Sequence, residues 1–75
     1  MKTQQRLDAE YTAWLGMVDE ALRIRVRIMA AGGMANKSAV EDELMPLFGI
    51  DRSAAHSILN YIEYHNLRHP QQVAA

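Results

Sequence analysis

The sequence contains no cysteine, and this absence excludes several classes of protein at once. It rules out a disulfide-stapled fold, a metal site held by thiolates and a cysteine nucleophile. There is also no run of about 18 apolar residues, and the first stretch, MKTQQRLDAEY, is polar and has no signal-peptide core. We therefore expect a soluble protein of the reducing cytoplasm, with no membrane partner.

Neither sign of charge dominates, because the formal net charge at pH 7 is −1. Residues 1–34 hold five Lys or Arg and four Asp or Glu, whereas residues 35–75 hold three and five. The first part is thus +1 and the second −2. Neither part is a basic tail of the kind that binds nucleic acid without structure.

Little in the sequence points to catalysis. His65 and His69 have the i, i+4 spacing of a helical metal pair, but no third ligand is near them in the sequence. Two exposed histidines at a fraying helix end are the simpler interpretation. We expect no enzyme, no metal and no cofactor, and no small-molecule substrate is evident.

Apolar residues, by contrast, are plentiful and make up 49% of the 75 positions. A chain this short forms one domain and buries only about 60% of its unfolded surface, so a core of its own is marginal. We therefore expect a homodimer. In the predicted single domain, residues 1–31 form a long dimerisation helix, 38–67 a helix-turn-helix-like unit and 69–75 a flexible tail.

Residues 22–29, LRIRVRIM, alternate apolar and basic side chains. Alternation by itself favours a half-buried strand or a basic edge. A helix explains the stretch better, because the helical register begins about four turns earlier and no turn residue interrupts positions 17–31. We predict a helix over about residues 5–30.

In that helix, the three arginines of the stretch point in different directions. Arg23 and Arg27 are expected to face solvent, whereas Arg25 turns towards the apolar side. A buried guanidinium needs an acidic partner, although a side chain that reaches back to solvent is an equally good alternative. The candidate partners are Glu41, Asp42 and Glu43.

The apolar stripe of the long helix spans roughly 200°, about twice what one small core requires. One seam repeats at three-four spacing from Trp14 to Ile28, and a second runs from Tyr11 to Met29. We predict that one seam covers the shorter helices and the other a second chain. The alternative is that both serve one three-helix core. The predicted dimer contacts are Tyr11, Trp14, Leu15, Val18, Leu22, Arg25 and Met29.

A second helix is predicted over about residues 39–48. In the sequence SAVE, Ser38 and Glu41 match a capping box, which would start this helix. Pro46 removes a backbone donor and should shorten or kink it, and Gly49 should end it.

A third helix is predicted over about residues 52–66, with Asp51 as its N-cap. Its amphipathic pattern separates a buried face from an exposed one. The expected buried residues are Ala54, Ala55, Ile58, Leu59, Tyr61 and Ile62, and those expected to face outward are Arg52, Ser53, His56, Ser57, Asn60, Glu63 and Tyr64.

A short helix, a glycine turn and a second amphipathic helix form the helix-turn-helix layout. Residues 43–69, ELMPLFGIDRSAAHSILNYIEYHNLRH, resemble the helix-turn-helix of winged-helix transcription regulators of the isocitrate-lyase-regulator type. The residues after Leu67 are too few for the two-stranded wing of that family, so we expect none. The matching positions are Leu44, Gly49, Ile50, Arg52, Ser53, Ala55, His56, Ile58, Leu59, Ile62 and Leu67.

The resemblance implies a dimeric transcription regulator that binds duplex DNA. Residues 52–64 would be the recognition helix, with Arg52 and Ser53 near phosphates and His56 and Asn60 at base edges, flanked by Ser57.

The acidic balance of residues 35–75 favours an alternative. In that hypothesis the chain is a small dimeric helical adaptor or inhibitor, of the kind that phages or mobile elements encode. It would bind a host protein through apolar surface and through an acidic patch of Glu41, Asp42 and Glu43.

Overall fold

The computed structural model of the protein describes residues 2–70, with side chains from residue 9 onwards, and within this range it contains three helices and no strand. The helices are α1 (Lys2–Ala30), α2 (Lys37–Phe48) and α3 (Arg52–Tyr64). The prediction of an all-α chain with one long and two short helices is confirmed, and LRIRVRIM lies inside α1. Of the predicted tail at 69–75, residues 71–75 lie outside the described residues.

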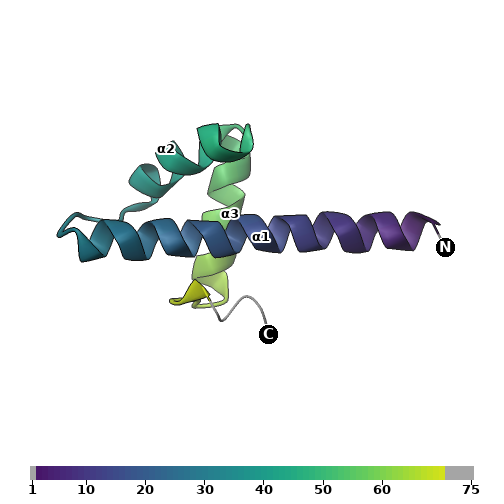
Figure 1. The fold of residues 1–75 in the computed structure, drawn as a ribbon, viewed down its shortest axis with the longest axis horizontal. Helices are drawn as coiled ribbons and strands as arrows, with labels where there is room; N and C mark the ends of the chain where they lie inside the picture. The colour runs from purple at the N-terminus through teal and green to yellow at the C-terminus, as the bar shows by residue number, and fades with distance from the viewer. Residues whose placement is uncertain (1, 71–75) are drawn as a thin grey trace.

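Helix α1 runs the length of the molecule, and the two shorter helices pack against only part of it (Figure 1). Helix α3 crosses α1 near its middle, while α2 lies beside the C-terminal half of α1 (Figure 1). The N-terminal part of α1 therefore extends beyond the bundle. None of the helices within residues 2–70 is both long enough and apolar enough to cross a membrane.

The start of α2 differs from the prediction. The helix begins at Lys37, and its N-cap is Asn36, whose side-chain oxygen accepts a 2.9 Å hydrogen bond from the Ala39 amide. The predicted capping box of Ser38 and Glu41 is therefore wrong. Asparagine caps a helix as well as serine does, and the Glu41 carboxylate is instead drawn to side chains of α3.

All three helices end in the same backbone motif. The residues that follow them, Gly32, Gly49 and Asn66, have φ angles of 82°, 64° and 52°, in the left-handed region. After each of them, the next amide donates to a carbonyl near the helix end: Gly33 to Ile28, Ile50 to Met45 and Leu67 to Ile62. These are the hydrogen bonds of the Schellman motif. The predicted end of α2 at Gly49 is confirmed, and the helix continues through Pro46 to reach it.

Two glycines allow a matched test of this motif. Gly49→Ala is expected to destabilise the fold by about 1 kcal/mol, because an L side chain is strained in the left-handed region even where space is open. Gly16 lies inside α1 with equally open space, so Gly16→Ala should stabilise the fold by about 0.5–1 kcal/mol. Urea denaturation of both variants measures whether each substitution lowers or raises the free energy of unfolding. Destabilisation by Gly16→Ala would contradict this explanation.

The three helices share one hydrophobic core. Val18 and Leu22 of α1 have no exposed surface, so the prediction that they contact a second chain is wrong. Part of the wide apolar stripe is explained by the packing of α1 against α2 and α3 of its own chain, whereas Tyr11 and Met29 of the second seam stay exposed. The buried core residues are Val18, Ala21, Leu22, Ile24, Val40, Leu44, Ala55, Ile58, Leu59 and Ile62.

Helix α3 is oriented almost as its sequence predicts. Asp51 is its N-cap and accepts a 2.8 Å hydrogen bond from the Ala54 amide, which confirms that prediction. Ala54 is exposed and not buried as expected, whereas its neighbour Ala55 is fully buried, so the buried face of α3 is narrower than predicted. Tyr61 is only half-buried, while the rest of the predicted inner face is buried.

Candidate nucleic-acid interface

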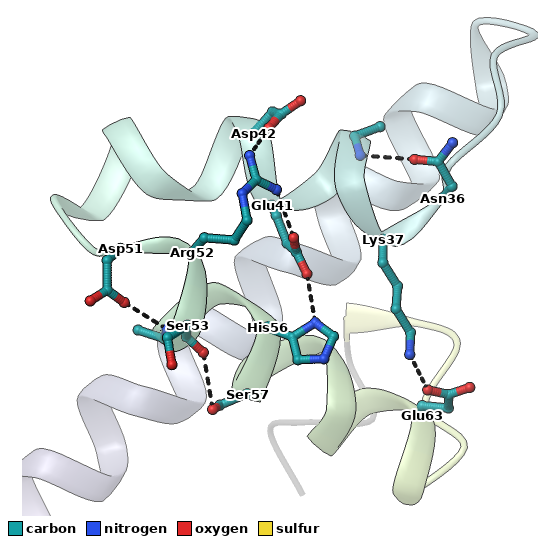
Figure 2. Close-up of polar contacts among 12 residues, drawn as sticks. Asn36, Lys37, Glu41, Asp42, Asp51, Arg52, Ser53, His56, Ser57 and Glu63 are labelled. Carbon is teal, nitrogen blue, oxygen red and sulfur yellow. Dashed lines mark hydrogen bonds and ion pairs between the residues drawn. The ribbon is translucent and has the colours of Figure 1, made fainter.

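Glu41 is the central residue of the polar face formed by α2 and α3. It is only 5% exposed, and its carboxylate accepts a 2.8 Å hydrogen bond from Nη1 of Arg52. Its second oxygen lies 3.0 Å from Nδ1 of His56 (Figure 2). One buried carboxylate of α2 thus holds two side chains of α3, each about half exposed.

Asp42 binds the same arginine from the solvent side. Its carboxylate lies 2.5 Å from Nη2 of Arg52, so the guanidinium sits between two carboxylates (Figure 2). The third acidic residue, Glu43, pairs with Arg27 of α1. Each member of the predicted acidic patch is therefore neutralised at least in part by a base of its own chain.

These pairs bear on the predicted environment of two arginines. Arg27 faces solvent as predicted, with its side chain 63% exposed, and it also bonds to Glu43 because α2 lies along this part of α1. For Arg25, pairing with the acidic cluster and a side chain reaching back to solvent were equally good alternatives; it makes no hydrogen bond or ion pair with any residue that the structure describes, so the pairing is not found. The acidic residues that it was predicted to meet are engaged by Arg27 and Arg52.

The contacts of Glu41 also keep it charged. The hydrogen bond with His56 is the largest influence that lowers the pKa of the Glu41 carboxyl, and the bond from Arg52 adds to it, while burial opposes both. The two carboxylates raise the pKa of Arg52, the Asp42 bond more than the Glu41 bond. Glu41 and Arg52 therefore both stay charged at neutral pH, which preserves the hydrogen bond between them.

The five predicted nucleic-acid contacts lie together on the outer face of α3, and all five side chains are exposed. Ser57 donates a 3.1 Å hydrogen bond to the Ser53 carbonyl oxygen, within the helix (Figure 2). At the edge of this face, Lys37 of α2 and Glu63 of α3 form a 2.6 Å ion pair. The residues of the predicted set are Arg52, Ser53, His56, Ser57 and Asn60.

The predicted dimer contacts do not form one surface. Trp14 stacks edge-to-face on Tyr61 of its own chain, with ring centroids 4.5 Å apart, and a hydrogen bond with Tyr11 raises the pKa of Tyr61. Tyr11 and Met29 are more than half exposed at two distant positions of α1, and Leu15 is half-buried between them.

The sequence prediction missed this aromatic cluster, which continues from Tyr61 to the ring of His65, 4.2 Å away. Its Trp14–Tyr61 contact joins α1 to α3. Its only sequence signal was the concentration of aromatic residues near position 11 and again near position 61.

Comparisons with protein-family models, with curated proteins and with solved structures found no match to this chain.

Proposed function

We propose that this protein binds duplex DNA through the outer face of α3, as a small helix-turn-helix regulator. One observation carries the proposal: the exposed polar side chains of α3 share a single face, and a buried carboxylate behind them holds Arg52 and His56 in position. A protein that reads DNA needs such pre-positioned side chains on a rigid helix.

Each residue has a chemical task in this proposal. Arg52, in the first turn of α3, would use its remaining N–H groups for a phosphate, aided by the positive end of the helix. Asn60, two turns further along, has an amide that can pair with adenine through two hydrogen bonds. Ser53, His56 and Ser57 would complete the contacts between these two positions.

The proposal includes binding as a dimer, because two copies of α3 would then meet successive turns of the major groove. The core contains Val18 and Leu22, so a second chain would have to use what remains of the predicted set. Tyr11, Leu15 and Met29 retain exposed surface on α1.

Charge sets the expected strength of binding. Around Arg52 and Lys37 stand three carboxylates, those of Glu41, Asp42 and Glu63, so the face is not basic. Since phosphate neutralisation supplies most non-specific affinity, we expect weak binding that is lost as salt rises. Asp42 limits this affinity most directly, because it holds Arg52 from the side where a phosphate would approach.

Removing that carboxylate should therefore strengthen DNA binding. Asp42→Asn is expected to tighten binding to duplex DNA about threefold at low salt and to steepen the slope of log affinity against log salt by about 0.9, the effect of one added phosphate contact. Glu43→Gln removes the same charge beside Arg27 and should change the affinity by less than half as much. Fluorescence anisotropy with a labelled duplex measures both variants, and Arg52→Ala should weaken binding.

An equal effect of Asp42→Asn and Glu43→Gln would show that only net charge matters, and would overturn the role given to Arg52. Sedimentation equilibrium of the same samples establishes how many chains bind. If neither the natural protein nor Asp42→Asn binds duplex DNA at low salt, the proposal fails.

A second candidate function is binding to a host protein. The observation that favours it is the number of large apolar side chains on the surface, since Met34 and Tyr64 are each more than 80% exposed. In this case Asp42→Asn would weaken capture of the partner and leave DNA binding absent, the reverse of the result expected above.

A further inference from the structure

Arg25 lines a cavity of about 360 Å³ between the middle of α1, the start of α2 and the end of α3. Its side chain is half-buried, yet it makes no hydrogen bond or ion pair with any residue that the structure describes. The two neighbouring arginines differ: Arg23 donates a 2.8 Å hydrogen bond to Asp19, and Arg27 pairs with Glu43. Of these three arginines of α1, only Arg25 lines the cavity, and only Arg25 lacks an acidic partner among the described residues.

The cavity is also rich in positive charge. The side chains of Arg25, Lys37 and Arg68 line it together with one carboxylate, that of Glu63. Glu63 is already paired with Lys37 at 2.6 Å. Arg25 therefore adds a positive charge to the lining that this carboxylate does not offset.

The rest of the wall is mainly apolar. It is built from Ala21, Val40, Leu59, Ile62 and Leu67, and Ala35, Asn36 and Asn66 complete the lining. All five of these apolar residues belong to the core or pack directly on it, so this wall is part of the packed interior of the fold. A cavity of this volume is at the small end of the range for ligand sites, and it has the volume of roughly a dozen water molecules.

We propose that this cavity binds a small organic anion with a single carboxylate or phosphate group on a short apolar body. A partly buried arginine without a counter-charge among the described residues favours an anionic ligand, and a carboxylate or phosphate can accept two parallel hydrogen bonds from its guanidinium. The Lys37 ammonium in the same lining would add a second donor, while the apolar wall would cover the body. This site is separate from the proposed DNA contacts and does not depend on them.

The alternating arginines provide a matched test. Benzoate and inorganic phosphate are titrated into the full chain and followed by NMR chemical shifts, with neutral benzamide as the control probe. Benzoate is expected to bind with a Kd of about 1 mM and to shift the signals of Val40, Leu59 and Ile62. Arg25→Gln should weaken this binding at least about tenfold, because it removes a charged contact made of two hydrogen bonds between the guanidinium and the carboxylate. Arg23→Gln, on the same helix but facing solvent, should change it less than about twofold.

Arg25→Lys keeps the positive charge but loses the planar guanidinium with its paired N–H donors. Its affinity for benzoate should therefore lie between the affinities of the natural protein and of Arg25→Gln. Binding of phosphate alone would support the anion site and assign it to phosphate-bearing ligands. If benzamide binds as well as benzoate, or if Arg25→Gln and Arg23→Gln bind alike, the proposal is overturned. Failure of both anions to bind would overturn it as well, whatever the outcome of the DNA experiments.

Discussion

Leu22→Ala is expected to destabilise the protein by about 3 kcal/mol, the usual cost of removing a fully buried leucine side chain from a packed core. A domain of this length rarely has more than about 3–5 kcal/mol of stability, so a large part of the population should unfold at room temperature. The effect is large because Leu22 lies where α1 faces the other two helices.

Met29→Ala is the matched control on the same helix. Met29 is 57% exposed, so truncation should change the stability of the isolated chain by less than about 0.5 kcal/mol. Urea denaturation followed by circular dichroism measures both variants. A small loss for Leu22→Ala would mean that α1 does not pack as described. A stability that depends on protein concentration and falls in Met29→Ala would support a second chain on that part of α1.

Glu41→Ala is expected to cost about 2 kcal/mol at neutral pH. It removes the carboxylate that accepts hydrogen bonds from both Arg52 and His56, and bonds to charged groups contribute about 1.5–3 kcal/mol before screening. Half-exposure of both partners places the expected loss in the lower part of that range. α3 should also become less firmly attached to α2.

The loss should depend on pH in a direction fixed by the lowered pKa of Glu41. A carboxyl whose pKa is lower in the folded state stabilises the fold above its unfolded value, near 4.5, and this stabilisation disappears as the pH falls through the folded value. The difference between the natural protein and Glu41→Ala should therefore be full at neutral pH and shrink in acid. Glu43→Ala, which breaks only the more exposed pair with Arg27, should cost less than about 0.5 kcal/mol. Equal losses for the two variants would contradict the central place of Glu41.

The sequence was sufficient for the features that depend on local chemistry. The helical register correctly predicted α1, Gly49 predicted the end of α2, and Asp51 predicted the start of α3. The outward face of α3 followed from its amphipathic pattern. The prediction of the N-cap of α2 was wrong because two residues that cap helices equally well, Asn36 and Ser38, lie two positions apart, and the sequence alone does not rank them.

Features that depend on which surfaces meet were harder to predict. A wide apolar stripe is equally compatible with a second chain and with two helices of the same chain, so Val18 and Leu22 were assigned to a dimer although they lie in the core. The pairing of Arg52 with Glu41 required the crossing of α2 and α3, which no local pattern encodes. The cavity beside Arg25 could not be foreseen, because it arises from all three helices together.

The shared ending of the three helices has a consequence for the speed of folding. In each case the reversal is specified by a residue suited to the left-handed region, Gly32, Gly49 or Asn66, and is closed by a hydrogen bond within the same short segment. The chain therefore does not need distant contacts to decide where a helix stops. Helical domains dominated by such short-range contacts fold within about microseconds to milliseconds, so the slow step here should be the docking of α3 across α1.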